Sequence, residues 1–151
     1  MRWFDPILPS TKIMYLFPVT VAESAVEGKG VFSVGKIPKG AVVWKYVPKH
    51  DRSLSQNEYE NLNTKEKEYM EKVAYLSLAS HQYIFPPEND PALYTNHDAK
   101  NHSLSVVMDI AISPEPHFIA NREIKPGEEL TNNYHEFDAS ISEKTAPDWL
   151  K

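Results

Sequence analysis

The sequence contains no cysteine, and this absence excludes two kinds of site. Disulfide bonds and thiolate metal sites both need cysteine, so neither can form in this chain. A chain without cysteine also suits a reducing compartment. The six histidines include no pair four residues apart on an expected helix with an acidic helper, which argues against a histidine metal site. We therefore expect no metal centre.

Long apolar runs and a basic surface are also missing. No apolar run reaches the roughly 20 residues that a membrane-spanning helix needs, and the first residues lack the charged-then-apolar order of a secretory signal. The net charge of −5 leaves no basic stripe to neutralise nucleic-acid phosphates. We expect a soluble intracellular protein, cytoplasmic or nuclear, that binds neither nucleic acid nor membrane directly. A mildly acidic surface suits a cationic partner, and it serves ordinary solubility equally well.

The 151 residues, 41% of them hydrophobic, are enough for one domain with a modest core. Short apolar runs separated by turn signals fill the first third of the chain and predict short strands. The runs are 13–17, 31–32 and 41–44, and the turn signals are 27–30 and 37–40.

One segment, residues 53–78, shows helical spacing of its apolar side chains. Ser55 followed by Glu58 matches the capping-box pattern that begins a helix. A break near 61–64 predicts two short helices rather than one. Farther along, 106–120 is typical of a hairpin around a proline-rich turn. The pattern indicates a mostly β protein with a helical insert.

Three other segments contain residues that suit a binding site. Residues 28–32 hold two glycines one residue apart, which lets backbone approach a ligand, and no helix follows as in a dinucleotide-binding loop. Residues 93–102 crowd asparagine and histidine between apolar runs, and 120–134 join a Pro-Gly turn to a tyrosine. Taken singly, each segment is more often a tight turn, a hydrated loop or a packed aromatic.

In this order the three segments resemble the SET domain of protein-lysine methyltransferases, in its compact stand-alone form without cysteine-rich flanks. The matching residues are Gly28-Lys29-Gly30, Asn96-His97 and the stretch 127–134, of which the last is the most specific. The likeness runs over residues 13–138, which is most of the chain.

A second Asn-His pair leaves an alternative open. Asn101-His102 is followed by serine and could itself be the family's motif. We prefer Asn96-His97, because Asp90 and Tyr94 precede it at offsets that resemble those of the family.

The sequence also departs from the family pattern at several positions. Leu93 stands where arginine is usual, and Asp98 replaces a serine. Asn132 occupies a position that is often aromatic, and Asn133 replaces an aspartate before the tyrosine. These changes bear on substrate geometry and on the number of methyl groups transferred more than on the fold.

The resemblance implies a fold and a division of the chain. The fold is mostly β with some α: short, mainly antiparallel sheets, a C-terminal pseudoknot and a small helical insert at about 53–78. The SET domain would span 13–138, preceded by an N-terminal extension, 1–12, and followed by a tail, 139–151.

The resemblance also implies chemistry and residue roles. The cofactor would be S-adenosyl-L-methionine, giving S-adenosyl-L-homocysteine, and the substrate would be a protein with an accessible lysine, such as a histone, a ribosomal protein or the chain itself. Tyr134 would be catalytic, and Tyr46 would line the lysine channel as the second catalytic residue. Cofactor binding would fall to Glu27, Gly28, Lys29, Gly30, Tyr75, Asn96, His97 and Phe137.

Two other interpretations compete with an active enzyme. A degenerate SET module that binds protein or cofactor without methyl transfer would explain the departures at Leu93, Asp98 and Asn133. A structural β domain with coincidental motifs would require several motifs to match the family independently by chance. Tyr46, Tyr134 and the two glycines favour the enzyme.

Overall fold

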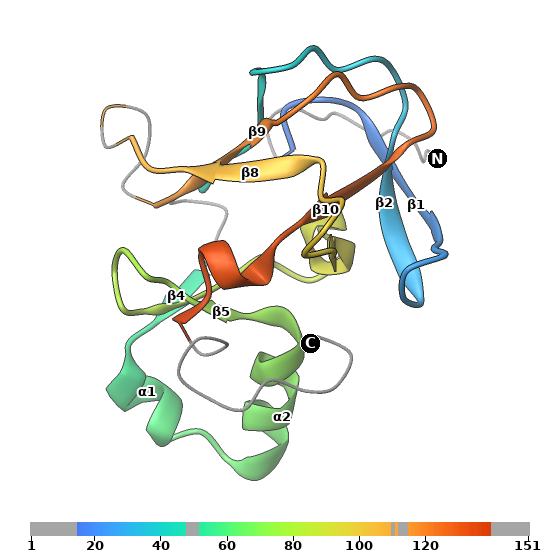
Figure 1. Cartoon of the computed structure of the whole chain (residues 1–151). Coiled ribbons are helices and arrows are strands. Elements are labelled where there is room, and N and C mark those ends of the chain that lie inside the picture. The colour runs from blue at the N-terminus through green and yellow to red at the C-terminus, as the bar shows by residue number, and fades with distance from the viewer. Residues whose placement is uncertain (1–14, 48–51, 110, 112–114, 140–151) are drawn as a thin grey trace.

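The computed structural model describes residues 15–47, 52–109, 111 and 115–139 (Figure 1). The expected N-terminal extension, 1–12, and all but the first residue of the expected tail lie outside the described residues. Residues 113–114 of the expected proline-rich turn lie outside them too.

The first sheet joins segments from both ends of the chain. Strands β1 (Val19–Glu23) and β2 (Lys29–Ser33) form an antiparallel hairpin, with Val21 opposite Val31. Strand β10 (Glu129–Asn132) pairs antiparallel with β2 and parallel with β7 (Asn96–His97), which gives the order β1-β2-β10-β7. The three segments singled out in the sequence therefore lie side by side in one sheet.

The second sheet contains the hairpin expected at 106–120. Strands β8 (Leu104–Val107) and β9 (His117–Ala120) pair antiparallel, and β3 (Val42–Trp44) pairs with the other side of β9. Residues from the first two sheets, together with those around them, pack into one cluster. Its members with no exposed surface are Val31, Ile37, Val43, Leu104, Ala120, Ile124 and Leu130. Burying each larger apolar side chain contributes about 1.5–3 kcal/mol, so this cluster holds the two sheets together.

The third sheet and the helices form the insert. Strand β6 (Tyr83–Phe85) pairs antiparallel with β4 (Arg52–Leu54) and with β5 (Tyr75–Leu76). Helices α1 (Gln56–Glu60) and α2 (Thr64–Val73) lie between β4 and β5 in the chain. Figure 1 shows the insert at one end of the molecule, with β10 running toward it from the other sheets.

Local signals explain both helices. Ser55 and Glu58 form the expected capping box, and Asn63 with Glu66 forms a second one that begins α2. The expected break is confirmed, but both ends of 53–78 are strands rather than helix. Among the described residues, no helix is long and apolar enough to cross a membrane.

The first strand also differs from the sequence prediction. The described part of the 13–17 run contributes one bridge, Tyr15 opposite Trp44, whereas the strand that pairs with β2 is Val19–Glu23. Gly30 lies within β2 rather than in the turn expected at 27–30. The predicted fold class, small and mainly antiparallel sheets with few helices, is confirmed.

The C-terminal segment packs against a strand from the middle of the chain. After β10 the chain forms a short 3₁₀ turn, Tyr134–Glu136, and then reaches the end of β5. Asp138 is bridged with Ser77 and accepts a hydrogen bond from the backbone of Leu76 at 3.1 Å. The C-terminal segment is therefore held against the end of β5, and its threading as a pseudoknot stays a prediction.

Candidate functional site

The amide of Asn96, in the second segment, contacts atoms of the first and third segments or of residues next to them. Its nitrogen Nδ2 lies 3.0 Å from the carbonyl oxygens of both Glu27 and Lys29. It also lies 2.9 Å from Glu129 Oε2 and 3.2 Å from Ser24 Oγ. A side-chain amide has two N–H groups, so four acceptors compete for two hydrogens. The site is therefore rich in acceptors.

Gly30 is required by its neighbours rather than by its own backbone angles. A β-carbon at this position would lie 2.8 Å from Glu129 Cδ and 3.1 Å from Asn96 Nδ2, closer than side chains normally pack. Gly28 has another reason to be glycine, because its φ of +45° is a conformation that other residues rarely adopt. The two glycines, which look alike in the sequence, thus serve different purposes.

Ser24 and Glu129 were not among the predicted site residues. Ser24 lies in the turn between β1 and β2, which the Ser24 N–H closes by donating to the Gly28 carbonyl at 2.8 Å. Its hydroxyl donates to the two carboxylate oxygens of Glu129 at 2.8 and 2.9 Å. Glu129 belongs to the third segment, which gave a signal, but nothing in the sequence marks Ser24.

His97 and Tyr134 are adjacent. The Tyr134 backbone N–H donates to His97 Nδ1 at 3.0 Å, and the two ring centroids are 4.9 Å apart. The Tyr134 hydroxyl donates to the carbonyl oxygen of Thr95 at 2.8 Å. The Thr95 hydroxyl is also bonded, at 2.5 Å, to that of Tyr15. The chain just before β7 therefore orients the Tyr134 hydroxyl.

The Tyr134 hydroxyl stays protonated at ordinary pH. Burial raises its pKa to about 12, and the negative charge of Asp138 adds to the increase. Burial raises the pKa of Tyr15 as well. At pH 7 to 9 Tyr134 is consequently a neutral dipole that donates one hydrogen bond and retains lone pairs to accept others.

The other predicted aromatic residues pack against Tyr134, against one another or against the core cluster. Phe137 is buried, with its ring edge-on to Tyr75 at 5.0 Å and to Tyr134 at 5.9 Å between centroids. Tyr46 is half-buried against the core cluster, which Tyr75 and Tyr134 also contact. Phe137 thus packs into an aromatic group instead of lying open at the surface.

The alternative pair, Asn101-His102, has different surroundings. Asn101 is exposed, in a turn whose backbone N–H groups at Lys100 and Asn101 are bonded by the Asp98 carboxylate at 3.1 and 2.9 Å. His102 lies 3.3 Å from a carboxylate oxygen of Glu136. Asp98, which replaces the family's usual serine, therefore stabilises this turn.

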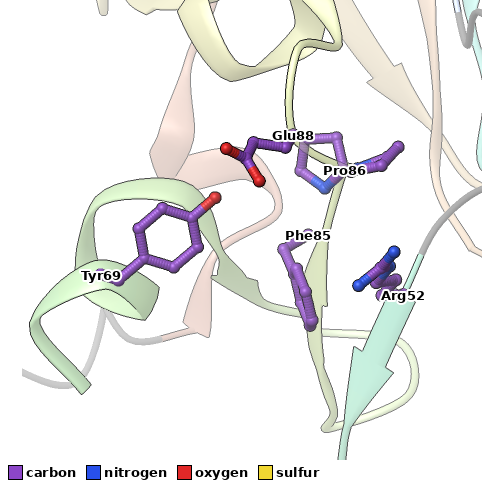
Figure 2. Close-up of a pocket in the computed structure, with 6 residues that line it drawn as sticks. Arg52, Tyr69, Phe85, Pro86 and Glu88 are labelled. Carbon is purple, nitrogen blue, oxygen red and sulfur yellow. The ribbon is translucent and has the colours of Figure 1, made fainter. Parts of the chain in front are cut away.

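A surface cavity of about 250 Å³ lies elsewhere, in the insert (Figure 2). It contains none of the predicted site residues, and its lining combines aromatic, proline and charged side chains. Figure 2 shows Tyr69 and Glu88 on one side of Phe85 and Arg52 on the other. The described part of the chain holds no group of three or more histidine, aspartate or glutamate residues that could bind a metal ion. The lining residues are Arg52, Tyr69, Phe85, Pro86, Pro87 and Glu88.

Comparisons with known proteins agree with this architecture. The SET-domain family model matches residues 28–135, a range that includes all three segments. No curated protein sequence matches the chain. The crystal structure of a Plasmodium falciparum candidate histone methyltransferase is similar in fold, with a TM-score of 0.53 and 19% identity over 78% of this chain and 93% of that chain. The family model covers well over half of the sequence, and the chain therefore belongs to the SET-domain family.

Proposed function

We propose that this protein is a protein-lysine methyltransferase that uses S-adenosyl-L-methionine. Its membership of the SET-domain family supports methyl transfer in general. The observation that best supports the specific proposal is the pairing of β10 with both β2 and β7. This pairing brings the glycine turn, Asn96-His97 and Tyr134 into one site.

The residues around Asn96 suit a cofactor that carries amino groups. The amide nitrogen of Asn96 is engaged by four oxygen acceptors, and its oxygen Oδ1 is left to accept from a ligand. We assign cofactor binding to residues 27–30, Tyr75, Asn96, His97 and Phe137, whose ring packs edge-on against Tyr75. When bound, S-adenosyl-L-methionine would supply an electrophilic methyl group on a positively charged sulfur.

Tyr134 would orient the reacting groups without acting as a base. Methyl transfer needs a neutral amine, and a free lysine titrates near ~10.4, so the site has to favour its deprotonation by desolvation. With a pKa of about 12, Tyr134 stays neutral throughout this range. Its hydroxyl, held by the Thr95 carbonyl, could then align the amine and the methyl group at roughly 3–3.5 Å, and such alignment supplies much of the rate.

Two tyrosines, Tyr46 and Tyr134, would favour the methylated product. Tyr46 and Tyr134 both pack half-buried against the core, and aromatic faces attract cations such as a methylated lysine. We propose a protein substrate with an accessible lysine, and histones, ribosomal proteins and the chain itself are the candidates to test.

Binding of S-adenosyl-L-homocysteine provides the first test. At a concentration of a hundred times its Kd, a ligand that binds only the folded state stabilises it by about 2.7 kcal/mol. For a chain of this size the melting temperature should rise by about 5 to 10 °C. We expect Asn96→Ala to weaken binding about tenfold, through loss of a hydrogen bond, and the exposed Asn101→Ala to leave it unchanged.

Two outcomes would contradict this prediction. An unchanged melting temperature, for protein shown to be free of carried-over cofactor, would favour the degenerate module. A larger loss with Asn101→Ala than with Asn96→Ala would mean that Asn101-His102 is the cofactor-binding pair.

A further inference from the structure

The orientation of the Asn96 amide is determined by its surroundings. Four oxygen atoms face its nitrogen, from Ser24, Glu27, Lys29 and Glu129. If the amide turned over, Oδ1 would face the carboxylate and two carbonyl oxygens at similar distances. The lone pairs of these oxygen atoms would then repel one another. The hydrogen-bond network therefore decides which end of the amide faces inward.

Glu129 provides the charged acceptor among these four. A hydrogen bond to a carboxylate is about twice as strong as one between neutral groups, so this contact contributes most to holding the amide. The Ser24 hydroxyl fixes the carboxylate through contacts to both of its oxygens. The missing side chain at Gly30 leaves the space in which the carboxylate lies.

The opposite end of the amide is available to a ligand. No described residue donates a hydrogen bond to Asn96 Oδ1, and Asn96 is partly exposed. A fixed acceptor at this position can receive a hydrogen bond from an amino group without first having to be reoriented.

We propose that Glu129 is a positioning residue that sets cofactor affinity through Asn96. Its carboxylate holds the amide nitrogen so that Oδ1 faces the cofactor and accepts from one of its amino groups. This inference rests on the proposed function, because it needs an adenosyl cofactor to bind at Asn96. Glu129 itself touches no cofactor atom in this account.

A double-mutant cycle tests the proposal. The Kd of S-adenosyl-L-homocysteine is measured by calorimetry for the wild type, Glu129→Ala, Asn96→Ala and the double variant. We expect Glu129→Ala alone to weaken binding about tenfold. In the Asn96→Ala background the same change should alter the Kd by less than about twofold, because residues that act as a unit are not additive.

Two further variants separate positioning from a loss of structure. Glu129→Gln keeps an oxygen that can accept from the Asn96 amide, so it should restore the Kd to within about threefold of the wild type. Glu128→Ala is the matched control, because the neighbouring Glu128 bonds Arg122 and the Lys125 backbone instead of Asn96. We expect it to leave the Kd unchanged.

Results that contradict the role of Glu129 differ from results that contradict cofactor binding by the protein. Equal losses from Glu129→Ala in both backgrounds would overturn the inference, because Glu129 would then act without Asn96. If Glu129→Ala does not fold, the Gln variant decides alone, and a loss as large as that of Asn96→Ala would also overturn it. Absence of binding by the folded wild type would instead contradict the proposed function, and this inference with it.

Discussion

Tyr134→Phe is expected to lower the single-turnover rate of methyl transfer about a hundredfold or more. The change removes one oxygen atom and keeps the ring, so packing against His97 and Phe137 should persist. Losing one preorganised polar group in an active site typically costs a factor of 10² to 10³ in rate. The Kd of S-adenosyl-L-homocysteine should stay within about twofold, the pattern of an interaction made mainly in the transition state.

Tyr15→Phe is the matched control for this experiment. Tyr15 is a buried tyrosine whose hydroxyl also bonds Thr95, but at the side-chain oxygen. Each variant loses one hydrogen bond between a tyrosine hydroxyl and Thr95, so each should lower the free energy of unfolding by about 1 kcal/mol. The rate per folded molecule should fall only for Tyr134→Phe. Near-normal turnover by that variant, or an equal fall with Tyr15→Phe, would contradict the catalytic role of Tyr134.

Gly30→Ala is expected to weaken cofactor binding about 30-fold or more. The added β-carbon would occupy the space of the Glu129 carboxylate and press on the Asn96 amide. The carboxylate is the flexible end of its side chain and can swing away, so the free energy of unfolding should fall by only about 1–3 kcal/mol. Several hydrogen bonds at Asn96 would be lost together, which is why the loss of affinity should exceed that of a single deletion.

Gly35→Ala tests whether the effect belongs to the site. Gly35 has no atom within 4 Å of an added β-carbon, and its φ is not in the left-handed region. We expect this variant to bind S-adenosyl-L-homocysteine like the wild type in the same titration. Wild-type affinity in Gly30→Ala would show that the contacts among Gly30, Asn96 and Glu129 do not matter for the cofactor.

The features of the fold that could be predicted from sequence are those set by neighbouring residues. The capping box at Ser55 depends on Glu58, three positions away, and the break before α2 depends on Asn63. The strand at the start of the insert, β4, was missed because it pairs with β6, which lies outside the helical pattern. Periodicity within 53–78 carries no information about that distant partner.

In the candidate site, too, contacts between residues far apart in the sequence could not be predicted. Asn96, His97 and Tyr134 came from a resemblance, and their roles remain predictions. The contact between Ser24 and Glu129 joins residues 105 positions apart, so no local pattern could indicate it. Thr95 was missed for a similar reason, because its carbonyl acquires a role only when Tyr134 folds onto it.

Identification of the methylated residue is the most direct test of the proposed activity. The wild type is incubated with S-adenosyl-L-methionine labelled in its methyl group and with histones, with a cell lysate, or alone, and the protein is then hydrolysed to amino acids. We expect the label in methylated lysine, in amounts that fall at least about a hundredfold with Tyr134→Phe. Folded wild type that binds S-adenosyl-L-homocysteine yet labels no lysine in any of the three mixtures would contradict the account.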